Sequence, residues 1–289
     1  MRLPSFDLLF PERVDDALAL LRDTGPRGIA MAGGTDVMVS MKRGALVPEV
    51  VVHVGGIPEL RGIRRENGTV VIGGGTTLGA LASSELLARD ARGVVDAAAR
   101  MGTVQVRTVG TAAGNLASAA ACGDLAPMLI ALEAKLRLRS ASFRERELPI
   151  EAFFTGVRGT VLNAGELITT LRIPTAAPRT GSAYVKFGYR GGAQVSVVSA
   201  AARVERDGER VRSARLVLGA VAPIPVVVQG AGLLAGERLE GAPLDAACLA
   251  AAAECAPISD VRGSEAYRRA MAAVVARHAL QTAWGRSAA

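Results

Sequence analysis

Histidine and cysteine are scarce in this sequence, which limits the metal sites that it can build. There are two histidines, His53 and His278, and three cysteines, Cys122, Cys248 and Cys255. Protein zinc and iron–sulfur centres draw most of their ligands from these two residue types. No two cysteines have the two-residue gap of a metal knuckle or a redox motif. We therefore expect no metal site in this chain.

Aromatic residues and long apolar runs are also scarce. Aromatic side chains make up 3% of the chain, so few rings are available to stack on a ligand. No run approaches the roughly 20 apolar residues that a membrane span needs. Residues 1–10 carry no cleavage signature, and an odd cysteine count is typical of a reducing compartment. We expect a cytoplasmic protein without a membrane span.

The positive charge comes almost entirely from arginine. The net charge is +7, and lysine occurs only at positions 42, 135 and 186. A basic chain can bind nucleic acid, but these arginines are scattered rather than clustered. Arg137, Arg139, Arg144 and Arg146 follow the alternating pattern of a solvated strand face. We predict no nucleic-acid binding; an arginine-rich coding bias or an acidic partner protein explains the charge more simply.

The chain of 289 residues changes texture near residues 175–180, a segment rich in proline, alanine and threonine. Before it, helical and strand-like patterns alternate, with a hairpin signal at Asn67-Gly68. After it, the pattern predicts three antiparallel strands, over 182–187, 195–206 and 210–221. Helices are then predicted over 225–234, 244–256 and 264–283. We predict an α+β protein with domains at 1–176 and 177–289, the first divided into subdomains at about 1–58 and 59–176.

Two glycine-rich segments carry the strongest functional signal. The first glycine segment, residues 30–36, reads Ala-Met-Ala-Gly-Gly-Thr-Asp, and the second, residues 107–115, reads Arg-Thr-Val-Gly-Thr-Ala-Ala-Gly-Asn. Glycines let backbone N–H groups approach phosphate oxygens closely. Two such segments in one domain predict a ligand with a diphosphate, held from two sides.

A third glycine cluster, residues 73–79, does not fit a nucleotide fingerprint. Leu78 occupies the place of the last glycine in the dinucleotide-binding motif, and no Walker lysine follows. We favour a packing role for Gly73, Gly74 and Gly75, with passage near the ligand as the alternative.

These residues resemble a known family, the flavin-binding medium subunits of the molybdenum hydroxylases, which include xanthine dehydrogenase and carbon monoxide dehydrogenase. The resemblance rests on the first segment, residues 111–115, Asp124 and the overall layout, and it covers nearly the full chain. It implies a two-subdomain FAD-binding domain of the vanillyl-alcohol-oxidase (PCMH) type, followed by a small C-terminal domain of three antiparallel strands and helices.

The resemblance also implies the residues that contact FAD. The two segments would hold the diphosphate, Asp124 would lie near the ribityl chain, and Leu167, Ile168 and Lys186 would lie by the isoalloxazine ring. The implied cofactor-binding residues are Met31, Ala32, Gly33, Gly34, Thr35, Asp36, Gly110, Thr111, Gly114, Asn115, Asp124, Leu167, Ile168 and Lys186.

Other roles are open for some of these side chains. Asp36 is also placed to cap a helix, and Asp124 to cap the helix predicted to follow it. Lys186 fits a surface salt bridge as well as a flavin contact. Tyr189 fits packing or stacking on the ring.

The sequence departs from the family pattern in two places. Ala113 stands where the family has the first of two paired glycines, which is compatible with the site only if its φ is not positive. Residues 187–194 lack the acidic residue and the aromatic that are common there, so the pattern does not predict what covers the flavin ring.

The expected function is that of an FAD-dependent electron-transfer subunit with no catalytic acid or base of its own. The resemblance implies a large molybdenum-cofactor subunit and a small [2Fe–2S] subunit as partners, in a dimer of heterotrimers. Electrons would pass from the clusters to FAD and then to NAD+, oxygen or another acceptor. The alternative is a stand-alone flavin oxidase of the vanillyl-alcohol-oxidase type.

Overall fold

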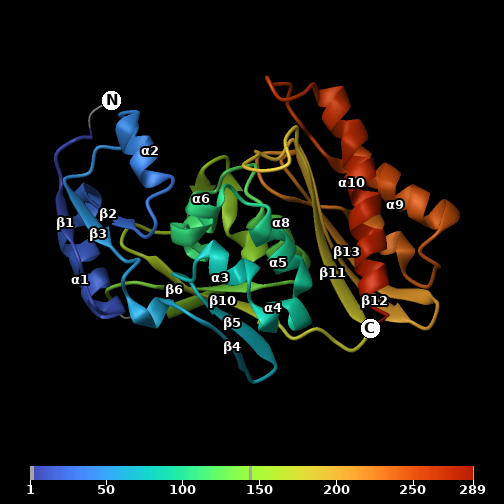
Figure 1. Ribbon diagram of the computed structural model, residues 1–289, viewed down its shortest axis with the longest axis horizontal. Helices are drawn as coiled ribbons and strands as arrows, with labels where there is room; N and C mark the ends of the chain where they lie inside the picture. Colours follow the sequence, from blue (N-terminus) through green and yellow to red (C-terminus); the bar gives the residue numbers. More distant parts are fainter. Residues whose placement is uncertain (1–2, 143–144, 289) are drawn as a thin grey trace.

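The structure is a computed structural model that describes residues 3–142 and 145–288 (Figure 1). Three larger sheets follow one another along the chain, each with its own helices. The predicted α+β class is confirmed. The domain limits 1–176 and 177–289, with a subdomain limit near residue 58, stay proposals.

The N-terminal sheet is parallel, with the strand order β1 (Asp7–Leu9), β3 (Val50–His53) and β2 (Gly28–Met31). Helix α1 (Val14–Thr24) contacts β2 and β3 and buries Val14, Ala17, Leu18 and Leu21. These positions recur at helical spacing, so one face of the helix is apolar. The first glycine segment leaves the C-terminal end of β2 and leads into helix α2 (Val37–Lys42).

The central sheet is antiparallel, and the helices of this region pack with it into one core. Its strands, in order, are β4 (Ile63–Glu66), β5 (Thr69–Gly73), β10 (Leu167–Pro174), β6 (Lys135–Arg139) and β7 (Glu145–Pro149). Asn67 and Gly68 both have positive φ, as a tight hairpin turn requires.

Two short helices follow β5 and the third glycine cluster, α3 (Leu78–Ala82) and α4 (Glu85–Asp90). Ser84 separates them because its hydroxyl accepts a hydrogen bond from the backbone N–H of Leu87 and so caps a new helix. Helix α5 (Arg92–Ala99) follows.

The C-terminal sheet is a meander of β11 (Thr180–Phe187), β12 (Val198–Asp207), β13 (Arg210–Gly219) and the two-residue strand β14 (Val226–Val227). The expected helix over 225–234 is wrong: β-branched residues pair with β13 as β14, and a 3-10 turn follows over Gln229–Leu234.

Helices cover the C-terminal sheet on both faces. Helices α9 (Gly241–Glu254) and α10 (Glu265–Arg286) lie on one side, and α5 and α8 (Leu125–Ala131) on the other (Figure 1). Neighbouring residues of β12 alternate between the two cores: Ala201 packs with the central helices, and Ala200 and Ala202 pack with α9 and α10. This packing fixes the C-terminal sheet against the central region.

The arginines with the alternating pattern lie in ion pairs on the protein's own surface. Arg137 pairs with Glu145 and Glu147, Arg139 with Asp15, and Arg146 with Glu166. Arg144 lies outside the described residues. Much of the local positive charge is therefore balanced within the chain.

Candidate functional site

A cavity of about 720 Å³ lies where the three parts of the chain meet. Its walls come from the first glycine segment, the region of helices α6 (Val104–Val109) and α7 (Ala112–Ala117), the start of β10, and residues of β11 and the loop after it. Except for Met31, all the predicted binding residues line it: Ala32, Gly33, Gly34, Thr35, Asp36, Gly110, Thr111, Gly114, Asn115, Asp124, Leu167, Ile168 and Lys186. Met31 ends β2, and its carbonyl accepts a hydrogen bond from Val54.

The two glycine segments touch each other at the edge of this cavity. A Cβ atom placed on Gly33 would lie 1.9 Å from the carbonyl oxygen of Val109 and 2.8 Å from the backbone nitrogen of Gly110. Only a residue without a side chain permits this approach. Gly34 turns the chain with φ +68°, a conformation that favours glycine. The sequence predicted two facing segments, and the fold brings them into backbone contact.

The second segment is not the open loop that its glycines suggest. It is formed by the end of helix α6 (Val104–Val109) and the start of helix α7 (Ala112–Ala117), with Gly110 and Thr111 between them. The Thr111 hydroxyl caps α7 by accepting a hydrogen bond from the Gly114 N–H at 3.1 Å. Thr103 and Thr111 begin α6 and α7 as N-caps whose hydroxyls accept backbone hydrogen bonds, and the alanines of α7 favour helix.

Ala113 fits the site because it lies in the first turn of α7, where φ is negative. Its backbone N–H donates to the carbonyl of Gly74 at 2.9 Å. The methyl group faces the third glycine cluster, at 3.1 Å from the position that a Cβ on Gly74 would occupy. The absence of a side chain at Gly74 thus leaves room for the alanine that replaces a family glycine.

The third glycine cluster serves close packing, as favoured from the sequence. A Cβ on Gly73 would lie 2.4 Å from the Leu60 carbonyl oxygen, and one on Gly74 would lie 2.2 Å from that of Ile168. Gly74 and Gly75 also line the cavity. The cluster therefore has the packing role and forms part of the cavity wall as well.

Asp124 stands at the centre of a buried polar cluster. One carboxylate oxygen accepts hydrogen bonds from the Tyr184 hydroxyl at 2.5 Å and the Ser196 hydroxyl at 2.6 Å. The other oxygen pairs with the Lys186 ammonium at 2.7 Å. Lys186 also donates to the carbonyl of Arg100 at 3.3 Å. Burial, followed by the negative charge of Asp124, raises the pKa of Tyr184 well above its usual value, so this hydroxyl remains a donor.

This cluster decides two questions that the sequence left open. The Asp124 side chain makes no capping hydrogen bond to α8, so the capping role is wrong. The Lys186 side chain is 1% exposed, so its ion pair is buried and is not a surface salt bridge. Tyr184 and Ser196, which the sequence analysis missed, hold the carboxylate in place. The alternation of β11 puts Tyr184 and Lys186 on the same face of the strand, which is the signal that was available.

Asp36 and Asn115 have polar side chains with little protein contact. Asp36 begins α2 but does not cap it, and its carboxylate lies 3.3 Å from the Arg158 guanidinium. The Asn115 side-chain oxygen is buried and accepts no hydrogen bond from any residue that the structure describes. A buried acceptor without a donor is costly, so this oxygen is suited to a donor on a ligand.

Two further charged residues line the cavity and were not among the predicted site residues. Arg158 lies at the turn between β8 (Phe154–Gly156) and β9 (Gly159–Thr160). Glu166 precedes β10 and accepts two hydrogen bonds from Arg146, at 3.0 and 2.7 Å. Glycines on both sides of the Val157-Arg158 pair signal a turn, but only the folded chain shows where that turn points.

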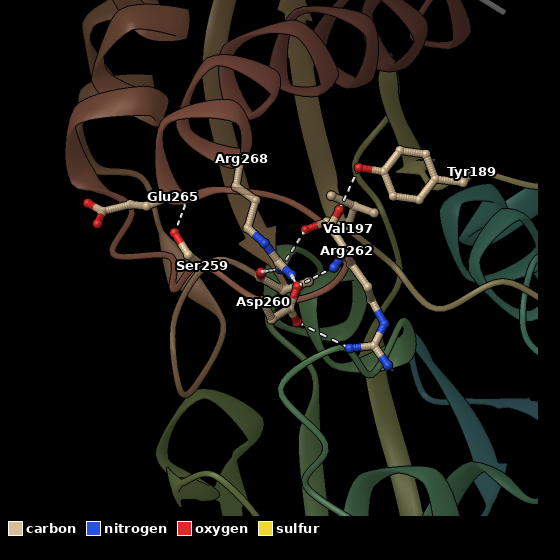
Figure 2. A network of polar contacts seen from close by, with 8 residues as sticks. Tyr189, Val197, Ser259, Asp260, Arg262, Glu265 and Arg268 are labelled. Carbon is tan, nitrogen blue, oxygen red and sulfur yellow. Dashed lines mark hydrogen bonds and ion pairs between the residues drawn. The ribbon is translucent and has the colours of Figure 1, made fainter.

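The loop after β11 completes the cavity wall with Ala193, Gln194 and Val195. Tyr189, in the same loop, does not line the cavity: its hydroxyl donates to the carbonyl of Arg262 at 2.5 Å, as Figure 2 shows. Its ring contacts Phe187 edge-on. Tyr189 is 63% exposed, and the contacts that it makes are with Phe187 and with Arg262, not with the cavity.

Figure 2 shows the network that holds this part of the C-terminal domain. The buried Arg268 guanidinium donates to the carbonyls of Val197 and Ala220 and to the carboxylate of Asp260 at 2.5 Å. Burial works against ionisation of Asp260, but hydrogen bonds from Arg262 and Arg268 outweigh it and lower the pKa of this carboxyl. The network joins the loop that carries Tyr189 to the start of α10.

Cys122 also lines the cavity. Burial first, and then the charge of Asp124, raise the pKa of Cys122 above its ordinary value. The thiolate is the reactive form, so this environment suppresses reactivity. Within residues 3–142 and 145–288, no group of three or more metal-ligating side chains is placed to hold a metal ion. In the same residues, no helix combines the length and apolar character needed to cross a membrane.

The fold and the cavity together define an FAD-binding domain of two lobes, followed by a smaller domain. One lobe is built on the N-terminal sheet and the other on the central sheet. Residues 4–176 match the family model described as the FAD binding domain in molybdopterin dehydrogenase, and residues 182–283 match that of the CO dehydrogenase flavoprotein C-terminal domain. The chain belongs to this family, the FAD-binding medium subunits of the molybdenum hydroxylases. It is an FAD-binding oxidoreductase subunit.

Known relatives are similar in sequence to this chain over most or all of its length. The carbon monoxide dehydrogenase medium chain of Hydrogenophaga pseudoflava is 34% identical and aligns over 99% of both proteins. The xanthine dehydrogenase FAD-binding subunit of Escherichia coli O157:H7 is 30% identical over 88% of this chain and 87% of that protein. A solved structure of the Hydrogenophaga pseudoflava enzyme superposes with a TM-score of 0.94, covering 99% of each chain.

The residues at the cavity fit FAD. The orphaned Asn115 oxygen needs a donor, the contact at Gly33 brings backbone from two lobes together, and the buried Leu167 and Ile168 offer an apolar wall. The cavity is also large enough for a dinucleotide-sized ligand, since ligand sites span about 300–1,000 Å³.

Proposed function

We propose that this chain is the electron-transfer subunit of a molybdenum hydroxylase. It receives electrons from the [2Fe–2S] clusters of a small partner subunit and passes them to NAD+, oxygen or another acceptor. FAD, when bound, supplies the redox chemistry, and the protein positions it and tunes its electronics. The observation that carries the proposal is the end-to-end match to a carbon monoxide dehydrogenase medium chain, at 99% of both proteins.

The proposed binding residues divide the cofactor between the lobes. Backbone groups of Ala32, Gly33, Gly34, Thr35 and Asp36 on one side, and of Gly110, Thr111 and Gly114 on the other, hold the diphosphate. Asn115, in the second segment, also lies at the diphosphate. Asp124 faces the ribityl chain, and Leu167, Ile168 and Lys186 face the ring. Met31 supports the first segment from β2, next to the cavity but outside its lining.

The charges in the cavity support electron transfer rather than substrate chemistry. Each of the acidic groups that line it is in an ion pair: Asp36 with Arg158, Asp124 with Lys186, and Glu166 with Arg146. No histidine is among the described residues that line it. These carboxylates are engaged in ion pairs and are therefore suited to binding rather than to general base catalysis.

The remaining parts of the proposal concern the assembly. A large molybdenum-cofactor subunit carries out the hydroxylation, the small subunit connects it to this chain, and the whole forms a dimer of heterotrimers in the cytoplasm. The surplus positive charge of the chain, +7, would favour partners with acidic surfaces.

Purification of the tagged chain from its native host tests this proposal. We expect FAD, iron and molybdenum to co-purify in fixed proportion, together with two further polypeptides. The bound flavin should be reduced by substrate in the complex and not in the isolated chain. A yellow chain that purifies alone, without either metal, and oxidises an organic substrate by itself would instead identify a stand-alone oxidase.

A further inference from the structure

The tip of the β8–β9 hairpin reaches the rim of the FAD cavity. The tip residue Arg158 has φ +61°, a left-handed conformation that is uncommon for residues other than glycine. Its backbone N–H donates to the carbonyl of Ala119 at 2.9 Å, so the tip is anchored just beyond α7. A non-glycine residue keeps such a conformation only where its surroundings enforce it.

The Arg158 side chain connects the two lobes that form the site. Its guanidinium donates to the carbonyl of Ser118, next to α7, at 3.2 Å and to the carboxylate of Asp36, next to the first glycine segment, at 3.3 Å. Both contacts are long, and the side chain is 58% exposed. Weak, exposed contacts of this kind are readily exchanged for a better partner.

Charge balance indicates what that partner is. Of the described residues that line the cavity, the cationic ones are Arg158 and Lys186. Lys186 is buried against Asp124 at 2.7 Å and is therefore not free to pair with a phosphate. The diphosphate of FAD carries two negative charges and would lie beside Asp36, whose carboxylate repels it. Arg158 is the cation that remains available at this end of the cavity.

We propose that Arg158 binds the diphosphate of FAD, exchanging its contact with Asp36 for the phosphate oxygens. The proposal rests on the binding of FAD between the two glycine segments and adds a third element, the hairpin tip, to that site. A guanidinium presents paired N–H donors that match phosphate oxygens. The Asp36 carboxylate holds the side chain in reach when no cofactor is bound.

A matched pair of variants tests this role. Arg158→Gly removes the side chain at a position where glycine suits the backbone, and Arg179→Gly does the same at φ +60° outside the cavity. Both variants lose one positive charge and relieve the same backbone strain. The full-length protein, in the form that holds FAD on purification, is stripped of flavin, and the dissociation constant of FAD is measured by flavin fluorescence.

We expect Arg158→Gly to raise the dissociation constant of FAD about five- to tenfold, as for one partly exposed charged hydrogen bond, and Arg179→Gly to leave it unchanged. The affinity for ADP, measured by displacement of FAD, should fall by the same factor, because ADP carries the diphosphate without the flavin. The salt dependence of binding should weaken in Arg158→Gly alone.

Asp36→Asn distinguishes two roles for Arg158: binding the phosphates, and holding the two lobes together through its contact with Asp36. If Arg158 serves the phosphates, removing the carboxylate frees the guanidinium and relieves the repulsion of the diphosphate, so FAD binds more tightly. Equal weakening by Asp36→Asn and Arg158→Gly would overturn the proposal, as would an Arg158→Gly variant that loses FAD affinity but keeps ADP affinity. Unchanged FAD binding in Arg158→Gly would also overturn it while leaving the FAD site intact. A wild-type chain without FAD affinity would instead refute the site itself.

Discussion

Replacing Gly33 by alanine should separate the two lobes of the FAD site. The new Cβ atom would lie 1.9 Å from the Val109 carbonyl oxygen and 2.3 Å from its carbon. Both are backbone atoms at the end of α6, which cannot rotate away as a flexible side chain would. The segments must move apart by about 1.5 Å before the contact becomes an ordinary one. The clash begins at Cβ, so alanine is sufficient and a branched side chain such as valine adds little.

The same displacement sets the magnitude of the effect on FAD. Overpacking of this kind costs about 1–3 kcal/mol of folding stability. A phosphate hydrogen bond of ordinary length is lost when its donor moves by about 1.5 Å, and each bond to a charged group is worth about 1.5–3 kcal/mol. Loss of one or two such bonds weakens binding by about 3 kcal/mol. The dissociation constant of FAD should therefore rise about a hundredfold.

The assay is a fluorescence titration of the flavin-free protein with FAD, alongside thermal unfolding without FAD. Gly56→Ala is the matched control in the same lobe, since a Cβ there would lie 4.0 Å from the His53 Nδ1, an ordinary van der Waals contact. We expect Gly56→Ala to bind FAD normally. If Gly33→Ala binds FAD within about threefold of wild type, then the backbone contact of the two segments does not hold the diphosphate and the reasoning fails.

Two further predictions concern ion pairs around the cavity. Asp124→Asn leaves the Lys186 ammonium buried without a counter-charge, so the free energy of unfolding of the flavin-free protein should fall by about 3–5 kcal/mol. Adding Lys186→Met should restore part of that loss. Equal free energies of unfolding in Asp124→Asn and wild type would contradict the buried pair. Burial alone would raise the pKa of Glu166, but hydrogen bonds from Arg146 and Asn163 hold it below its usual value. A lowered folded pKa stabilises the protein above the unfolded pKa of about 4.3, and this stabilisation is lost as the pH falls through the folded value. Denaturant unfolding should thus show Glu166→Gln destabilised by about 1 kcal/mol at pH 7, with the difference from wild type shrinking below about pH 4; a constant difference down to pH 3 would refute the link to ionisation.

Local sequence patterns were enough to predict the structure where the residue types themselves restrict the backbone conformation. Asn67-Gly68 fixed the hairpin turn, and the apolar spacing in residues 14–21 fixed the buried face of α1. The same kind of reasoning failed for residues 225–234, where an apolar run was expected to be a helix. There the pairing of Val226 and Val227 with β13 outweighed any local preference.

The same distinction separates the site residues that the sequence could indicate from those that it could not. Its glycines could be named from the sequence because close backbone approach needs a residue without a side chain, and the resemblance to the family added Asp124. Arg158 could not, since an arginine on a hairpin tip looks like any exposed arginine until the hairpin is placed. The capping role of Asp124 was wrong for a related reason: donors from β11 and from Ser196, far away in the sequence, compete for its oxygens.

The sequence by itself determined which residues can take tight turns and which faces are apolar, and it predicted that two glycine-bearing segments would hold one ligand from two sides. The tertiary structure alone decided that Gly33 touches Val109, that Lys186 is sealed against Asp124, and that the Arg158 hairpin tip lies between the lobes. The physical reason is the distance along the sequence over which each kind of interaction acts. Backbone conformation and amphipathicity are encoded over a few neighbouring residues, whereas these contacts join segments that only the packing of three sheets brings together.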